Sequence, residues 1–287
     1  LIEELAKHYG FNNFQSTLPV GNNLNNKGEY WYKRKYISEL LSSNNFYEIQ
    51  TLSFADSESN KIFSPEKNPV TVINPIDQTQ ENLRTNLLFS LINTYKYNYE
   101  NNSVSHKYYE INNIYDDGKH KLYKNIPNQE YSLGFLIPEY ESNTDSRGEL
   151  IHNDIHTLTN YIKLLFPQVQ FEQISRPGFH KNYSYILKFN NQIIGFMGKL
   201  SYKAQSSFNL DTPLYIMQIN TENFNLNEVE VIKYQALSSF PFIKFDLSFS
   251  VKNDFRASEL IEYIETLLPN NENKISIFDN FRNEKSR

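Results

Sequence analysis

The chain has 287 residues and a formal net charge of −5, which leaves room for one large or two ordinary domains and disfavours nucleic-acid binding without a partner. The absence of cysteine excludes disulfides, thiolate metal sites and cysteine nucleophiles, so a bound metal would depend on oxygen ligands or on the six histidines. There is no run of eighteen apolar residues and no signal-peptide pattern, and we therefore expect a cytoplasmic protein without membrane contact.

The chain opens in the middle of a predicted helix, LIEELAKHY, which ends at Gly10. Because the only methionines are Met197 and Met217, we expect a piece of a longer protein. Two adjacent carboxylates, Glu3 and Glu4, lie in the first turn of the helix, where the macrodipole stabilises negative charge. From the local sequence they are solvated carboxylates, since a Mg²⁺ ion would need more oxygen ligands than this segment supplies.

The periodicity of apolar residues predicts the other elements. In chain order they are a helix over 29–43, a β-rich run over 46–54, a short strand over 70–75, a helix from Leu83 to Tyr95, a strand over 107–115 with a turn at Asp116–Gly118, a strand over 131–137, a helix over 151–165, a hairpin over 183–199 that turns at Asn190 and Asn191, a strand over 214–219, a strand over 242–251, a helix over 258–268 and a strand over 274–281. Helices and hairpins are mixed without the regular alternation of a parallel sheet, which predicts an α+β fold with an antiparallel sheet.

The segment HNDIH (152–156) places two histidines four residues apart, as zinc proteases do on one helix face. Asn153 stands where those enzymes have their general base, and no third ligand is evident. Two interpretations follow: surface histidines on a helix whose other face is core, or a metal hydrolase that uses His152 and His156.

The segment FRNE (281–284) matches the Phe-Arg-x-Glu signature with which class II aminoacyl-tRNA synthetases hold ATP. We interpret this four-residue match as coincidence, because little predicted sheet follows it. The chain has only nine glycines and contains neither a P-loop nor a GxGxxG motif, so we do not expect it to bind a nucleotide alone.

Several segments, in order and over nearly the whole chain, resemble the β subunit of bacterial phenylalanine–tRNA synthetase. They are LIEELAKHYGFNNFQSTLP, YISELLSSNNFYEIQTLSF, VINPIDQTQENLRTNLLFSLINTYKYN, KYYEINNIY, RPGFHKNYSYILKFNNQIIGFMGKL and SSFPFIKFDLSFSV. The most specific of these signals is NP followed by LRT at this spacing.

The resemblance implies three regions: residues 1–20 end an upstream helical module, residues 21–230 form a catalytically inert core like that of class II synthetases, and residues 231–287 form an incomplete anticodon-binding domain. The fold expected is an antiparallel sheet flanked by helices, plus a partial ferredoxin-like β-α-β unit. The implied partners are the α subunit, in an α2β2 assembly, and tRNA-Phe. The helix around LRTNLL and the hairpin over 183–199 are candidate parts of the subunit interface.

The resemblance also has implications for cofactors and chemistry. In the family, the α subunit uses ATP to form phenylalanyl-adenylate and charges the tRNA, so this fragment alone is predicted to be inactive. An Asp-x-x-Glu-Glu turn contributes ligands to a Mg²⁺ shared with the α subunit, and Glu3 and Glu4 fall on its two glutamates. The aspartate would precede Leu1, which predicts weak or absent binding of the ion. The editing domain lies upstream, so no proofreading is expected.

Four positions depart from the family pattern: Asn112, Arg176, Phe179 and Phe245. They put RNA contacts through these positions in doubt. An alternative hypothesis is a stand-alone RNA-binding paralogue of the same fold, which would form a self-contained dimer without the α subunit.

Overall fold

The computed structural model describes residues 1–17, 29–102, 104–120, 123, 126–223, 243–252, 255, 257–268, 275–279 and 281. Its contacts divide the chain into a first unit, Leu1–Glu230, and a second unit, Val231–Arg287. In the described ranges, no helix is both long and apolar enough to cross a membrane.

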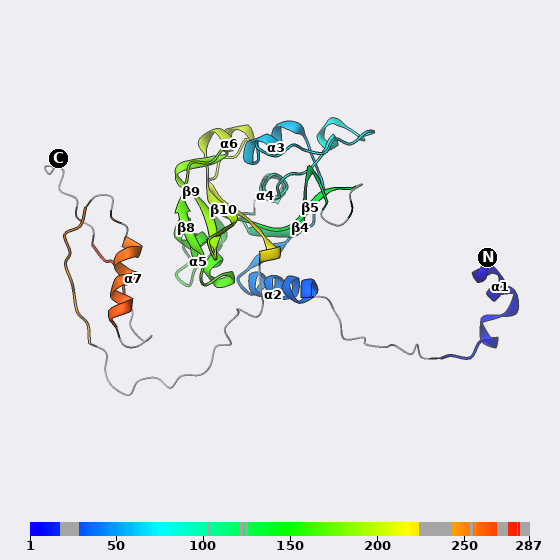
Figure 1. The fold of residues 1–287 in the computed structure, drawn as a ribbon, viewed down its shortest axis with the longest axis horizontal. Helices are drawn as coiled ribbons and strands as arrows, with labels where there is room; N and C mark the ends of the chain where they lie inside the picture. The colour runs from blue at the N-terminus through cyan, green and yellow to red at the C-terminus, as the bar shows by residue number, and fades with distance from the viewer. Residues whose placement is uncertain are drawn as a thin grey trace. The chain divides into compact units, whose positions relative to one another are not determined.

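The first unit is built on one seven-stranded sheet, shown in Figure 1. Its strands, in spatial order, are β1 (Phe46–Glu48), β4 (Lys107–Lys119), β5 (Pro127–Pro138), β11 (Leu214–Asn220), β10 (Gln192–Leu200), β9 (Phe179–Phe189) and β8 (Gln170–Gln173). Only the edge pair of β1 and β4 is parallel, and the other neighbours are antiparallel. The predicted antiparallel sheet is therefore confirmed.

The two faces of the sheet carry two separate apolar cores, because side chains alternate between faces along a strand. Tyr109 and Ile111 of β4 belong to one core, together with α2 (Glu29–Ser43) and α5 (Ile155–Leu165). Tyr108 of β4 belongs to the other core, together with α3 (Ser57–Phe63), α4 (Leu88–Asn102) and α6 (Tyr202–Ser207). In Figure 1 helices accordingly cover both faces.

Helix α4 packs against the sheet at Gly134 of β5. A Cβ atom added to Gly134 would lie 2.9 Å from Leu91 Cδ1 and 3.0 Å from Leu87 Cβ, so this glycine lets the helix approach the strand closely. Buried leucines on the inner face of α4 therefore lie directly on the central strands.

The predicted hairpin is confirmed, and the helix predicted over 151–165 is confirmed except for its start. The hairpin of β9 and β10 turns at Asn190 and Asn191, which have φ angles of 49° and 62°. Helix α5 begins at Ile155, four residues after the predicted start, because the Asp154 side chain caps it and accepts a hydrogen bond of 2.8 Å from the Thr157 amide.

The remaining elements of the first unit are short. They are α1 (Ile2–Tyr9), the 3-10 turns η1 (Phe11–Asn13), η2 (Gln78–Gln80) and η3 (Thr221–Asn223), the pair β2 (Phe54–Ala55) and β3 (Asn82–Leu83), and the pair β6 (Tyr140–Thr144) and β7 (Leu150–His152). Helices α3 and α6 and strands β6, β7 and β8 are absent from the sequence prediction, since they are short and their apolar periodicity is weak.

Three further predictions of local structure were wrong. Residues 70–75 form no strand beyond one bridge between Thr71 and Asn82, since Pro69 and Pro75 lack backbone donors. Residues 116–118 are part of β4 and do not form the predicted turn. The pairing of β4 with β5 is irregular there, with a register shift between Asp116 and Lys119. The helix expected from Leu83 begins at Leu88.

In the second unit, the helix predicted over 258–268 is confirmed as α7 (Ala257–Leu267). The structure differs from the two predicted strands, since none of the described residues 243–252 and 275–279 belongs to a strand. The apolar side chains that would form a sheet face remain exposed, for example Phe245 at 78% and Leu247 at 63%. A strand needs a hydrogen-bonded neighbour and a covered face, and the described residues of this unit supply neither.

Candidate functional site

The arginine of the LRT motif lies in a buried polar network. Arg84 Nη1 is 3.0 Å from Glu110 Oε1 and donates to Thr51 Oγ1 at 2.8 Å, and Arg84 Nε donates to the Asn113 carbonyl at 3.1 Å. Glu110 also accepts hydrogen bonds from Thr51 Oγ1 and Asn112 Nδ2, at 2.8 and 3.1 Å. Both charged side chains are 0% exposed, so Arg84 is a structural residue that no ligand can reach in this form.

The next residues of the motif hold the start of α4 in place. Leu87 N donates to Gln218 Oε1 of β11 at 2.7 Å, and Leu88 N donates to Asn86 Oδ1 at 3.1 Å. Since helix N-termini leave backbone amides without partners, these side chains act as caps. Residues 84–88 are 0% exposed, so the subunit contact predicted for the helix around LRTNLL would have to involve other residues of α4.

A second buried ion pair lies between β4 and β6. Lys107 Nζ is 3.3 Å from Glu141 Oε1 and donates to Tyr161 Oη at 3.0 Å. Asn153 Nδ2 donates to the same Glu141 oxygen at 3.0 Å. The side chains of Lys107 and Glu141 are 6% and 2% exposed, so this pair joins β4 to β6 and α5.

This network also settles the role of the HNDIH segment. His152 ends β7 and lies against Tyr140, with ring centroids 5.0 Å apart, while His156 is exposed in the first turn of α5. The two histidines therefore do not share a helix face, and Asn153 between them is a buried structural residue. Among the described residues, no group of three His, Cys, Asp or Glu side chains could hold a metal ion. The geometry assumed by the metal-hydrolase interpretation was wrong.

Glu3 and Glu4 lie on α1, whose residues contribute nothing to a core. Lys7 Nζ is 3.4 Å from Glu3 Oε1 and 3.2 Å from Glu4 Oε1, and all three side chains are at least half exposed. Mg²⁺ requires close to six oxygen ligands in octahedral geometry. These two carboxylates, already paired with a lysine, do not fit that requirement by themselves.

Three of the four departures from the family pattern are structural residues here. Arg176 Nη2 is 2.8 Å from Glu66 Oε1 and donates to the Phe63 carbonyl at 3.1 Å, and its guanidinium carbon lies 4.1 Å from the Phe196 ring centroid. Phe179 is 5% exposed, and Asn112 donates to Glu110. Phe245, in contrast, is exposed in the second unit. Of the FRNE segment, only Phe281 is among the described residues, and it is 86% exposed.

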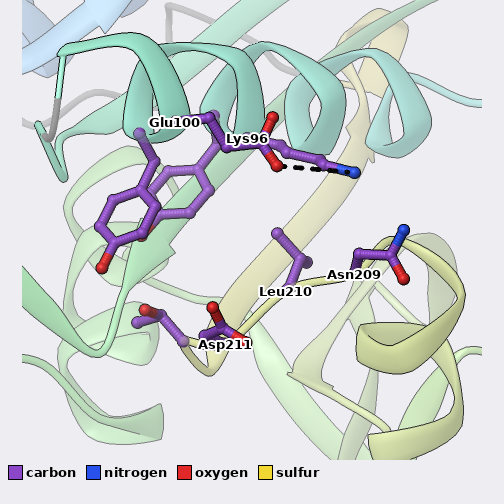
Figure 2. A pocket seen from close by; sticks show the side chains of 8 residues that line it. Lys96, Glu100, Asn209, Leu210 and Asp211 are labelled. Carbon is purple, nitrogen blue, oxygen red and sulfur yellow. Dashed lines mark ion pairs between the residues drawn. The ribbon is translucent and has the colours of Figure 1, made fainter.

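Sequence reasoning missed a cleft of about 250 Å³ between α4 and the loop before β11 (Figure 2). We call it the α4 cleft; it is lined by Tyr95, Lys96, Tyr99, Glu100, Asn209, Leu210, Asp211 and Thr212. Figure 2 shows Lys96 and Glu100 on the helix side and Asn209, Leu210 and Asp211 on the loop side. The spacing of the two tyrosines by one helical turn was the only signal in the sequence.

Both walls of the α4 cleft are held by local structure. The Tyr95 and Tyr99 rings stack with centroids 5.9 Å apart, and the Tyr95 hydroxyl lies 3.0 Å from Ser105 Oγ. Burial raises the pKa of Tyr95 above its ordinary value of 10.0, so the phenol stays protonated at neutral pH. Asn209 adopts a φ of 52° after α6, and the Leu210 amide donates to the Gln205 carbonyl, which fixes the start of the loop.

A second cavity, of about 370 Å³, is lined by residues of α2, β4, β5 and η3, including Arg34 and Tyr131. Arg34 is already engaged: it pairs with Glu48 and donates to the Ile111 carbonyl and to Tyr131 Oη, each at 3.0 Å. The guanidinium joins α2 to three strands, and so its main role is structural.

The architecture has counterparts among solved structures. Two structures of a pyrrolysyl-tRNA synthetase from Desulfitobacterium hafniense superpose with TM-scores of 0.52 and 0.54, at 9% and 8% identity, over 70% of this chain and 69–70% of theirs. The chain therefore has the fold of the class II aminoacyl-tRNA synthetases. A family model described as the phenylalanyl tRNA synthetase beta chain CLM domain matches residues 14–221, and the chain belongs to this family.

Curated relatives that match the chain include two proteins named phenylalanine–tRNA ligase beta subunit. The protein from Halalkalibacterium halodurans is 26% identical over 92% of this chain and 34% of its own length, and that from Shouchella clausii is 26% identical over 99% and 36%. The chain thus spans about a third of the length of these relatives.

Proposed function

We propose that this chain is a non-catalytic part of a phenylalanine–tRNA ligase β subunit, which supports the ATP-dependent charging of tRNA-Phe by holding the α subunit and positioning the tRNA. The observation that carries the proposal is the family match over residues 14–221, together with the two relatives described above, which carry this name. A cytoplasmic location and an α2β2 assembly belong to the same proposal.

The buried network around Arg84 supports a non-catalytic role. Transition-state stabilisation requires hydrogen-bond donors, dipoles or charges that face the substrate. The arginine of the most specific family motif instead pairs with Glu110 at 0% exposure, and α4 covers the same region of the sheet. In this chain the arginine of the motif therefore stabilises the fold. A fold shared with synthetases is by itself a poor guide to activity.

The hairpin of β9 and β10 remains the candidate contact with the α subunit. Tyr183 is 43% exposed and Ile193 is 63% exposed, although most of the hairpin packs into the two cores. Aromatic and aliphatic side chains of this kind are typical anchors of a subunit interface.

The second unit is proposed to contribute to positioning of the tRNA, as part of a ferredoxin-like anticodon-binding domain. Support comes from α7, where the apolar Leu260, Ile261 and Ile264 share one side. Unpaired RNA bases are bound mainly by stacking and edge contacts, so the acidic net charge of the chain does not oppose this role.

The test is co-expression of this chain with the α subunit from the same source, followed by size-exclusion chromatography and an assay of phenylalanine-dependent pyrophosphate exchange. We expect a stable complex whose activity is lost when the α active site is mutated. Ile193→Lys is expected to reduce co-purification at least about tenfold, while Leu164→Lys, at a 46% exposed position of α5, serves as control. Absence of a complex, with tRNA still bound by this chain alone, would instead support a stand-alone RNA-binding paralogue.

A further inference from the structure

We propose that the α4 cleft binds a guanidinium group, carried either by an arginine side chain of a polypeptide or by a small organic cation. This site is separate from the proposed scaffold role, since none of the residues that carry it belongs to the buried networks or to the β9–β10 hairpin.

The size of the cleft limits the ligand to about one side chain. Pockets for drug-sized ligands have volumes of roughly 300–1,000 Å³. The α4 cleft, with about 250 Å³, is smaller than these, and it opens at the surface beside Tyr99, which is 40% exposed. A nucleotide is too large, whereas the planar end of an arginine fits.

The charges that line the cleft favour a cation. Lys96 Nζ is 3.8 Å from Glu100 Oε1, so these two opposite charges offset each other. The remaining charge is the exposed carboxylate of Asp211, which has no hydrogen bond or ion pair with any residue that the structure describes. The net charge of the lining is therefore −1, and a free carboxylate matches the paired donors of a guanidinium.

The aromatic wall adds selectivity for a flat cation. Tyr99 stacks on Tyr95 at an interplanar angle of 12° and still keeps part of its surface open to the cleft. A guanidinium that lies against such a ring gains a cation–π interaction, and its planar shape stacks better than an ammonium.

The cleft is also preorganised, which lowers the entropic cost of binding. Tyr95 is fully buried and held by Ser105, and the loop that carries Asp211 starts from hydrogen bonds of the Asn209 and Leu210 amides. The side chains left to order on binding include those of Asp211, Lys96 and Glu100.

The experiment is a ¹H–¹⁵N NMR titration of the full chain with N-acetyl-arginine amide, with ethylguanidinium, and with N-acetyl-norleucine amide as the uncharged analogue. We expect saturable shifts of the amides of residues 209–212 with the first two probes only. Tighter binding of the arginine amide assigns the site to a polypeptide, and tighter binding of ethylguanidinium assigns it to a small cation.

Three variants test the chemistry, and thermal melting verifies that each is folded. Asp211→Asn is expected to weaken binding about tenfold, since it removes a charged hydrogen bond. Tyr99→Leu should weaken it about threefold. Lys96→Gln should strengthen it about twofold, because it removes a like charge. Glu39→Gln, on an exposed ion pair of α2, is the matched control and should change nothing.

The proposal is overturned if norleucine amide binds as well as arginine amide, if Asp211→Asn leaves the affinity unchanged, or if no saturable shift occurs at residues 209–212. Because none of these readouts involves the α subunit or tRNA, failure of this proposal is distinguishable from failure of the proposed function.

Discussion

Charged groups near the two ends of α4 are in opposite states. Before its N-terminal end, Arg84 and Glu110 are fully buried and paired with each other, and only Arg84 Nη2 lacks a hydrogen-bond partner among the described atoms of this pair. Along the C-terminal half, the α4 cleft holds Asp211, an exposed carboxylate without a partner among the described residues. The region around Arg84 contains the most specific sequence motif, and its charged side chains stabilise the fold. The α4 cleft contains no motif, but it has an open carboxylate and an aromatic ring that a ligand could contact. The sequence motif and the groups that could bind a ligand thus lie near opposite ends of α4.

The largest expected effect comes from breaking the buried pair. Arg84→Met leaves the Glu110 carboxylate uncompensated in the core, and we expect a loss of about 4 kcal/mol in the free energy of unfolding. Urea unfolding followed by fluorescence of the single tryptophan, Trp31, measures it. The exposed Arg147→Met is the control and should stay within about 0.5 kcal/mol. A similar small loss for Arg84→Met would contradict the structural role.

Lys107→Met tests whether the second buried pair behaves in the same way. Glu141 keeps its hydrogen bond from Asn153 in this variant, so we expect a somewhat smaller loss, about 3 kcal/mol. In the double variant Lys107→Met/Glu141→Gln, the loss should be smaller than the sum of the single losses, because the two side chains interact. Additive losses would show that the pair is not coupled. Lys35→Met, in an exposed pair with Glu39, is the matched control.

Asp154 is intermediate between the buried ion pairs and the exposed Asp211. Its side chain is partly exposed, and it accepts a hydrogen bond from the Thr157 amide at the start of α5. Burial acts to raise the pKa of its carboxyl, but hydrogen bonds from Thr157 and the charge of His156 outweigh burial and hold this pKa below the ordinary value of 3.8. A lowered pKa in the folded state stabilises the fold above the unfolded pKa, and this contribution is lost as the pH falls through the folded pKa.

We therefore expect Asp154→Ala to cost about 1 kcal/mol at pH 7 and progressively less as the pH is lowered below 3.8. The measurement is urea unfolding of both proteins from pH 7 to pH 2.5. Asp145→Ala, in an exposed turn outside any helix, provides a comparison for the helix-cap effect. A cost for Asp154→Ala that did not change with pH would rule out the charged cap.

The smallest expected effect on stability is that of a substitution in the α4 cleft. Asp211→Asn should change the free energy of unfolding by less than about 0.5 kcal/mol, because no described residue pairs with the carboxylate. A loss above 1 kcal/mol would show that Asp211 belongs to the structure, as Arg84 does, and would remove the contrast between the two ends of α4.

Much of the first unit could be predicted from the sequence. The helices over 29–43 and in the region of 155–165, the hairpin at Asn190 and Asn191, and the strands before Tyr115 and around Phe135 all follow from apolar periodicity or turn chemistry. The short elements β6, β7, β8 and α6 could not, since segments of three to six residues contain too few apolar positions to define a period.

The candidate site residues were harder to predict. His152 and His156 have helical spacing in the sequence, but Asp154 caps the helix between them and places them on different elements. Tyr99 and Asp211 are more than one hundred residues apart and meet only because α4 and the loop before β11 pack on the same face of the sheet.

By itself the sequence determined the elements with a clear period, the membership of the chain in its family, and the absence of thiol chemistry, because each of these depends on residue type and spacing along the chain. Only the tertiary structure decided which charged side chains are buried and which are accessible to solvent. The partners that bury Arg84 and Lys107 come from distant strands, whereas Asp211 is exposed and has no partner among the described residues. Burial by distant partners makes a charged side chain part of the core, and the lack of such burial leaves it available to a ligand.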